Sequence, residues 1–413
     1  MSDINHHLCK VRTITTFLSL DADRSSWATA IQEASDCCAQ VSAALLQENY
    51  LVQSIRIVTN PFGEYLRTDH VDNAKQDLLY LSRLLQDANS GNDLRLRFAI
   101  GEARTIDEIT LLPELINTFG DLCNVCVNID MDNQGVLDNK AILASAKAVQ
   151  HISTITPRGE GNFNFTVNFN CQPLIPYFPA SYHRRELGRK LVIGLETPDL
   201  LVHELSVFND LDKNKNASHH TLHAGYYQVM HHALQQHIDD INRIVTTIKL
   251  PHGFNFSGFD SSAAPSKDCA SMVEVYQQLG VEYFGAAGTV EASALLTRVF
   301  KSITGVELVG FSGLMLALTE DSGLAAGSIN GDFDIRSLLT YSAVCGIGLD
   351  TVPIPGDTSI EKIAALMRDT GTMAYRLDKP LTVRVFPVPG LQAGDLTAFE
   401  SDDLCNCAVL AVP

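Results

Sequence analysis

The sequence predicts a single α/β domain with mainly parallel strands, and three observations carry that prediction. Roughly the first 150 residues alternate between short β-rich runs and longer runs with helical periodicity. Such alternation is typical of parallel strands joined by crossover helices. Hydrophobic residues make up 46% of the 413, which is ample for one large core. No linker, repeat or low-complexity segment interrupts the chain, so we predict one domain over residues 1–413.

The first half of the chain alternates strictly between predicted strands and predicted helices. The strands are β-rich runs, and in the helices apolar side chains recur every three or four positions. The predicted strands are residues 11–20, 52–59, 94–100 and 123–129. The predicted helices are residues 27–49, 71–85, 106–119 and 139–152.

The second half is less regular, and longer loops separate its elements. The predicted strands are residues 163–169, 191–195, 254–260, 350–354, 381–388 and 405–412. The predicted helices are residues 222–249, 269–279, 289–302 and 359–370. The apolar segment 308–318 fits neither period and stays ambiguous. A loop with three prolines at 170–190 and a polar loop at 210–218 complete this half.

The stretch 341–358, YSAVCGIGLDTVPIPGDT, gathers reactive groups at a tight crossing. A helical run ends at Cys345, two glycines turn the backbone, and a short strand starts at Asp350. Polar groups at strand ends are where chemistry usually lies in α/β folds, which makes Asp350 a candidate catalytic carboxylate. Cys345 is a second candidate, although the dipole at a helix C-terminus disfavours a thiolate. The alternative interpretation is a glycine-rich connection with capping aspartates.

Short motifs along the whole chain resemble one family. They are Arg12-Thr-Ile-Thr15, Asn128, Asn170, Pro176 with His183, Asp260-Ser-Ser-Ala-Ala-Pro265, Gly285-Ala-Ala-Gly-Thr289, Phe311-Ser-Gly313, Glu320-Asp-Ser-Gly323 and the stretch 341–358. In this order they resemble the domain-of-unknown-function 711 family, also called uncharacterised protein family 0210. The resemblance implies a fold, a single large α/β barrel similar to that of pyruvate formate-lyase and related glycyl-radical enzymes. It implies no particular activity.

The barrel that the resemblance implies does not bring radical chemistry with it. Glycyl-radical enzymes resemble one another in a C-terminal glycine loop flanked by Arg-Val and an aromatic residue. The C-terminal glycines of this chain, Gly390 and Gly394, lie in VPGLQAGDL and lack that pattern. We therefore expect a barrel without the radical motif.

Charge and composition limit the partners and the compartment. The formal charge of −18 argues against nucleic acid or an anionic membrane surface as a partner. No apolar run reaches about 18 residues, so no membrane span is expected. The N-terminus lacks the apolar core of a signal peptide, and ten cysteines in such a chain are typical of reduced thiols in the cytoplasm. The exposed faces of the long helices allow a homo-oligomer.

His183 stands in a local excess of positive charge. It ends a proline-braced loop and is followed by four basic residues within seven positions, the first of them Arg184. The functional interpretation is an anion-binding mouth, with His183 as the acid/base group and Arg184 as a substrate ligand. The alternative is a surface loop with solvated charges. The histidines between 219 and 237 are interpreted as mostly exposed on one helix.

Further polar residues are predicted to meet where strands end and where one helix begins. Asn170, Glu196 and Asp260 each follow or end a predicted strand, and in a barrel such residues can converge. We expect Asp260 to exchange protons with His183. The predicted substrate-binding residues are Asn170, Ser262, Gly288, Thr289, Ser312 and Arg184. Gly288 and Thr289 are included because they open a helix, and helix N-termini bind anions.

The sequence therefore predicts a non-radical enzyme with acid/base chemistry, a hydrolase or a lyase, acting on a small polar or carboxylate-bearing metabolite in the barrel lumen. One alternative is a divalent-metal-dependent enzyme with Glu196 and Asp260 as ligands, because oxygen-rich sites suit hard cations. The other is a catalytically inert ligand-binding or interaction protein. The residue pattern does not choose between hydrolase and lyase.

Overall fold

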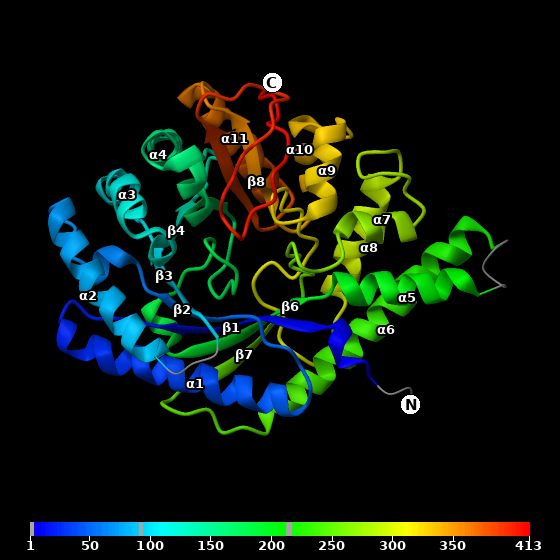
Figure 1. Cartoon of the computed structure of the whole chain (residues 1–413), viewed down its shortest axis with the longest axis horizontal. Helices are drawn as coiled ribbons and strands as arrows, with labels where there is room; N and C mark the ends of the chain where they lie inside the picture. The colour runs from blue at the N-terminus through cyan, green and yellow to red at the C-terminus, as the bar shows by residue number, and fades with distance from the viewer. Residues whose placement is uncertain (1–3, 91–93, 212–216) are drawn as a thin grey trace.

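The centre of the molecule is one mixed sheet of nine strands in the order β7-β6-β1-β2-β3-β4-β5-β9-β8. The structure is a computed structural model that describes residues 4–90, 94–211 and 217–413. Helices surround the sheet on the outside, and loops enter the space that it encloses (Figure 1). No helix in the described part of the chain is long and apolar enough to cross a membrane. Residues 212–216 of the predicted polar loop lie outside the described residues.

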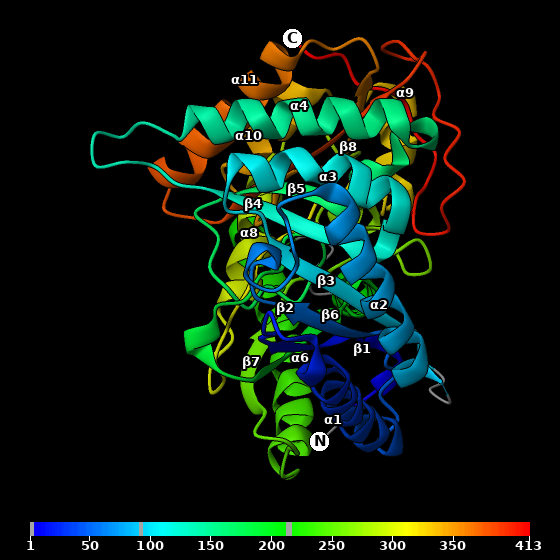
Figure 2. The ribbon, with the colours of Figure 1, turned by 90° about the vertical axis from the view of Figure 1, so that its left-hand side faces the viewer.

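The first five strands run parallel to one another, as the sequence predicts. Their bounds are β1 (Lys10–Leu18), β2 (Ile55–Thr59), β3 (Leu96–Glu102), β4 (Asn124–Ile129) and β5 (Phe165–Phe169). Four helices join them, α1 (Trp27–Gln47), α2 (Val71–Asn89), α3 (Ile106–Phe119) and α4 (Asn139–Ile155). Figure 2 shows these helices side by side over the outer face of the five strands. The β-α alternation of the sequence therefore becomes one half of the barrel.

Two pairs of strands flank this half and run in the opposite direction. β6 (Lys190–Glu196) pairs antiparallel with β1, and β7 (Asn255–Asp260) continues parallel to β6. On the other side β9 (Leu381–Val388) pairs antiparallel with β5, and β8 (Gly348–Pro355) continues parallel to β9. As a result, the ends at which β6, β7 and β9 finish lie beside the ends at which β1 to β5 begin.

The ambiguous segment 308–318 closes the sheet into a barrel by touching both of its edges. Leu308 bridges to Phe259 of β7, and Ala317 bridges to Asp350 of β8, both in the parallel sense. The segment comes so close that a Cβ on Gly258 would lie 2.2 Å from the Glu307 carbonyl oxygen. A closed sheet has no unpaired edge, and the predicted α/β barrel is thereby confirmed.

The remaining helices cover the second half of the barrel. They are α5 (Pro198–Asp210), α6 (His219–Thr246), α7 (Met272–Gln278), α8 (Thr289–Lys301), α9 (Ser322–Asn330), α10 (Ile335–Ser342) and α11 (Ile360–Arg376). The predicted strand at 405–412 is wrong, because only Ala408 makes a bridge, to Leu396. Its backbone instead donates hydrogen bonds elsewhere: the Cys405 N–H donates to the Thr319 carbonyl, and the Leu410 N–H donates to the Pro353 carbonyl of β8.

The loop between β5 and β6 enters the barrel, which the sequence interpretation does not anticipate. The Pro176 carbonyl accepts a hydrogen bond from Thr15 Oγ1 at 3.1 Å, and Asn168 Nδ2 donates to the Ala180 carbonyl at 3.0 Å. The Tyr177 hydroxyl donates to the Leu195 carbonyl and accepts from the Leu195 N–H. Each of these partners lies on a barrel strand, so this loop, residues 170–189 and called the plug loop below, fills the lumen instead of forming an anion-binding mouth.

Candidate functional site

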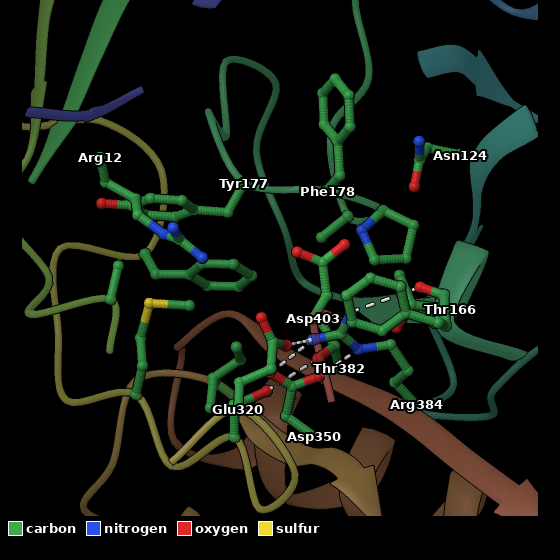
Figure 3. A pocket seen from close by; sticks show the side chains of 18 of the residues that line it. Arg12, Asn124, Thr166, Tyr177, Phe178, Glu320, Asp350, Thr382, Arg384 and Asp403 are labelled. Carbon is green, nitrogen blue, oxygen red and sulfur yellow. Dashed lines mark hydrogen bonds and ion pairs between the residues drawn. The ribbon is translucent and has the colours of Figure 1, made fainter. Parts of the chain in front are cut away.

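The barrel encloses a cavity of about 60 Å³ at the end where the first five strands begin. Each of those strands gives one lining residue near its start, namely Arg12, Arg56, Arg97, Asn124 and Thr166. Most of the remaining wall comes from the plug loop, the closing segment 308–318, β8, β9 and the C-terminal segment. Figure 3 shows Arg12 and Tyr177 on one side of the cavity and Arg384 with its carboxylates on the other. The cavity therefore collects residues from the whole length of the chain.

Arginines reach this cavity because each lies on the inward face of a strand. Arg56 and Arg97 are direct register partners on β2 and β3, so they leave the sheet on the same side. Side chains two positions further on share that face, and Val58 and Ala99 there form a small apolar cluster inside the barrel. Their neighbours Ile57 and Phe98 point the other way, into the main core under the helices. The side chains of arginines at these positions therefore point into the lumen.

Two of the lining arginines have carboxylate partners. Arg97 Nη2 donates to both oxygens of Asp403, each at 3.0 Å. Arg384 is held by Asp350 through Nε and Nη2, at 2.6 and 3.0 Å. Arg384 Nη2 also donates to Glu320 Oε1 at 2.5 Å. Bidentate pairs of this kind are strong and fix the geometry of both partners.

The other two lining arginines, Arg12 and Arg56, have no carboxylate partner among the described residues. Arg12 Nη1 donates to Gln53 Oε1 at 3.1 Å. Arg56 is 7% exposed, donates to Ser54 Oγ and to the Pro176 carbonyl, and lies 4.8 Å from the centre of the Phe178 ring. Burial, with the charges of Arg97 and Arg12 adding to it, lowers the pKa of Arg56 to about 9. Both guanidiniums keep donors free for an anion in the cavity.

Glu320 is a lining carboxyl group whose pKa is raised. Burial raises the pKa of Glu320, the charge of Arg384 opposes this, and the charge of Asp350 adds to it. A raised pKa favours the protonated form of a carboxyl group, from which a proton can be donated. Arg384 fixes Glu320 and Asp350 together, so the cavity contains a carboxyl pair of the kind that acid/base chemistry uses.

His183 and Arg184 lie at the opposite end of the barrel and do not line the cavity. The side chain of His183 is fully buried, and neither ring nitrogen has a hydrogen-bond partner in the described structure. Burial lowers the pKa of His183 to about 4. Arg184 pairs with the buried Glu102 of β3, which also accepts from Arg104 Nε at 2.8 Å. The predicted anion-binding mouth is not found here, because His183 is buried without a polar partner and Arg184 is occupied by Glu102.

The predicted convergence of strand-end residues is only partly found. Asp350 lines the cavity, but Asn170 lies at the far end of the barrel and donates to Asp378 at 3.2 Å. Asp260 is fully buried and accepts from the N–H groups of Ser262, Phe311 and Ser312 at 3.0, 2.8 and 3.0 Å. Its carboxylate thus shapes the turn that carries Phe311 into the cavity wall.

The hydroxyl groups of Ser262 and Ser312 form hydrogen bonds with the same turn. Ser262 Oγ accepts from the Gly313 N–H at 3.0 Å, and Ser312 Oγ donates to the Val309 carbonyl at 2.8 Å. Neither side chain lines the cavity. They stand directly behind its wall.

The predicted metal ligands do not come together. Glu196 accepts from Lys10 Nζ at 3.0 Å and from Gln53 Nε2 at 2.8 Å, while Asp260 is occupied by backbone amides. Across the described residues no three His, Cys, Asp or Glu side chains are placed to hold one metal ion. The donor set therefore does not fit the divalent metal that the sequence suggests.

Gly288, Thr289 and Cys345 lie outside the cavity wall. Gly288 and Thr289 open α8, where Thr289 Oγ1 donates to the Ala286 carbonyl at 2.7 Å. Cys345 is buried, and its thiol accepts from the Gly348 N–H at 3.4 Å. One predicted surface histidine, His237, is also buried and shares a hydrogen bond with Tyr50 at 3.1 Å.

The residues that the sequence interpretation missed are arginines and one glutamate. Arg56, Arg97 and Arg384 each interrupt an apolar strand, in Ile-Arg-Ile, Leu-Arg-Phe and Val-Arg-Val. A single arginine between apolar neighbours in several strands is a signal for a charged lumen, because one face of each strand must then carry a charge. Arg12 and Glu320 stand in the family motifs, but the sequence pattern alone predicts no role for them.

Fold and site together define an α/β barrel whose plugged lumen is lined by arginines and carboxylates. The chain belongs to the family described as Uncharacterised ACR (DUF711), whose model matches residues 2–400. The predicted family membership is thus confirmed.

Curated relatives carry the same family name, UPF0210 protein. The one from Pyrobaculum arsenaticum is 29% identical over 61% of this chain and 55% of its own length. The one from Clostridium beijerinckii is 26% identical over 70% of this chain and 63% of its own length. The one from Desulforudis audaxviator is 38% identical over 36% of this chain and 33% of its own length. This chain spans less than two thirds of the length of these relatives.

One solved structure similar to this chain is an anaerobic ribonucleotide reductase from Thermotoga maritima with citrate in its active site. The match covers 92% of this chain and 82% of the reductase chain, at 8% sequence identity and a TM-score of 0.39.

Proposed function

We propose that this protein is a non-radical enzyme of the hydrolase or lyase type that acts by acid/base catalysis on a small carboxylate-bearing metabolite in the barrel lumen. The observation that supports it most is Arg56, which is buried, borders the cavity and has no carboxylate partner in the described part of the chain. A buried charge without a partner is costly. A carboxylate ligand would supply the missing charge.

The opposite wall supplies the groups for proton transfer. Glu320 and Asp350 both contact Arg384, and the raised pKa of Glu320 favours its protonated form. In this proposal Arg12 and Arg56 hold the substrate carboxylate, and Glu320 donates a proton to the leaving group. Asp350 fixes Arg384, and Arg384 in turn orients Glu320. His183 and Asp260, the acid/base pair expected from the sequence, take no part because neither lines the cavity.

The charged lining of the lumen disfavours the alternative of a catalytically inert binding protein. That alternative predicts an apolar lumen, whereas four arginines and several carboxylates line this one.

The cytoplasm is the compartment that we propose, with small molecules as partners. All ten cysteines are described, and each is a free thiol, which suits a reducing compartment.

The proposal is tested by a conversion assay on the full chain. The protein is incubated with a panel of small carboxylic acids and their esters and amides, and products are followed by proton NMR. For any compound that is converted, Glu320→Gln should lower kcat by about a hundredfold or more, because a proton donor is lost. Glu361→Gln, on the exposed surface of α11, is the control and should match the wild type. Full turnover by Glu320→Gln would remove Glu320 from the mechanism.

A further inference from the structure

Two of the four arginines that line the cavity have no direct carboxylate partner in the described part of the chain. Arg97 is matched by Asp403, and Arg384 by the carboxyl pair Asp350 and Glu320. The fourth lining carboxylate, Asp121, accepts from Arg95, which lies outside the cavity lining, at 2.6 Å. Arg12 and Arg56 remain without a hydrogen bond or ion pair to a carboxylate among the described residues, and the more distant charges of Glu320 and Asp403 act on them.

The register of the sheet makes the lack of a direct partner costly for Arg56. Arg56 and Arg97 stand directly opposite each other on β2 and β3, and like charges in that position repel. Asp403 compensates Arg97 from the C-terminal segment, but Arg56 has only neutral partners, Ser54 and the Pro176 carbonyl. An anion between Arg12 and Arg56 would remove the repulsion. The fold therefore holds a preformed place for negative charge.

The volume of the cavity and the chemistry of its wall limit which ligands can fit. A cavity of about 60 Å³ has room for about four to six water-sized groups, since one water needs about 10–15 Å³ by the same measure. Phe178, Phe311 and Met315 give one part of the wall an apolar surface. A ligand that fits is short, carries its charge at its ends, and has methylene carbons that can lie against these side chains.

We propose that the lumen binds a short dicarboxylate, of the class of malonate and succinate, whose two carboxylates neutralise Arg12 and Arg56. This inference rests on the proposed function and specifies its substrate class. The planar fork of a guanidinium matches a carboxylate in bidentate fashion. Phosphate could carry the same charge, but it presents oxygens on every side, and the apolar part of this wall offers them no donors.

Isothermal titration calorimetry on the full chain at neutral pH tests the inference with defined compounds. Malonate and succinate are the test ligands. Acetate has one charge, malonamide has none, citrate is too large, and inorganic phosphate has a different shape. We expect the best dicarboxylate to bind at least about tenfold more tightly than each of these four, because only it supplies two matched charges in the available volume.

Substitutions of the lining arginines test whether the dicarboxylate binds in the lumen. Arg56→Gln should weaken dicarboxylate binding by about 30-fold or more, the scale for truncating one member of a buried charge pair. Arg12→Gln, at a half-buried position, should weaken it as well and covers the case in which Arg56→Gln does not fold. Arg336→Gln removes an exposed arginine on α10 and is the matched control, expected to bind as the wild type does.

The outcomes separate this inference from the proposed function. If acetate binds as tightly as succinate and Arg56→Gln weakens both, the lumen takes monocarboxylates and only the dicarboxylate inference falls. Tighter binding of phosphate than of any dicarboxylate would overturn the inference in favour of a phosphate ligand. If no carboxylate binds, or Arg56→Gln and Arg12→Gln bind as the control does, both the inference and the proposed function fall.

Discussion

The two ends of the barrel both bury charged side chains, but they use them differently. At the end where β1 to β5 finish, the carboxylate of Glu102 is enclosed by Arg184, Arg104 and Asn128. At the end where they begin, Arg12 and Arg56 face the cavity, and neither forms a hydrogen bond or ion pair with a carboxylate among the described residues. The comparison shows that buried charge alone does not mark a site. Pairing separates a charge that holds the fold together from a charge that awaits a ligand.

The plug loop connects the two ends and explains why they differ. Arg184, in the second half of the loop, is fixed by Glu102 at one end, and the Pro176 carbonyl contacts Thr15 and Arg56 nearer the cavity. Anchoring at the first end positions the loop residues that form the wall at the second. Each of the following predictions tests one side of this comparison.

The largest expected effect comes from breaking the anchored end. Glu102→Gln leaves Arg184 without its carboxylate, and removing one member of a buried ion pair costs about 3–5 kcal/mol. We expect Glu102→Gln to lower the free energy of unfolding, measured in urea, by about 3 kcal/mol. This is the low end of the range, because the Arg184 side chain is 25% exposed and partly solvated. Glu400→Gln, whose carboxylate is 76% exposed beside Arg158, is the control and should change stability by less than about 1 kcal/mol. Equal stability of the two variants would remove the anchoring role of Glu102.

A second effect should appear as the pH falls. Burial lowers the pKa of His183 to about 4, whereas an unfolded histidine takes a proton near pH 6.5. The unfolding free energy is therefore full above about pH 6.5 and falls as the pH decreases towards about 4, by on the order of 3 kcal/mol for this group. The buried His237, whose pKa is also lowered to about 4 by burial, acts in the same direction.

The variant His183→Leu isolates the contribution of that one group. Its stability should fall about 2–3 kcal/mol less than that of the wild type between neutral pH and about pH 4.5, measured by urea unfolding at each pH. His203→Gln, exposed on α5, is the control and should follow the wild-type curve. If His183→Leu showed the wild-type pH dependence, His183 would not be the buried neutral group that the structure shows.

The smallest expected effect concerns the basic run after His183. Arg185 pairs with Asp21 at 2.7 Å, and the two side chains are 50% and 62% exposed. Such a pair is worth little, so Arg185→Gln should change stability by less than about 1 kcal/mol. It should also leave the affinity for malonate within about twofold of the wild type, because Arg185 does not line the cavity. A clear loss of affinity would place the anion site at this end of the barrel.

Most of the secondary structure could be predicted because the signals are local. The helix predicted at 106–119 is found at Ile106–Phe119, and the strand predicted at 381–388 is found at Leu381–Val388. The segment 308–318 could not be assigned, since its role depends on two edges that lie far from it in sequence. The segment 405–412 is predicted as a strand because its residues form an apolar run. In the structure this run is buried without a β-ladder, which depends on contacts far away in the sequence.

For the site, the sequence pointed to Asp350 and to the motifs that contain Arg12 and Glu320, but it favoured His183 and Arg184 over the strand arginines. The rule that site residues follow the carboxyl ends of parallel strands misleads here. In this barrel the cavity lies where β1 to β5 begin, and Asp260, at the carboxyl end of β7, is occupied by backbone amides behind the wall.

The sequence by itself determined the α/β class, the order of the elements and the family, because periodicity, turn residues and motifs are readable within short windows. Only the tertiary structure decided which charges meet. Arg97 and Asp403 are separated by 306 positions and Arg384 and Glu320 by 64, yet both pairs line one cavity. Whether an arginine is paired or free depends on distances across the closed barrel. Those distances arise from the long-range pairing of strands, which no local pattern records.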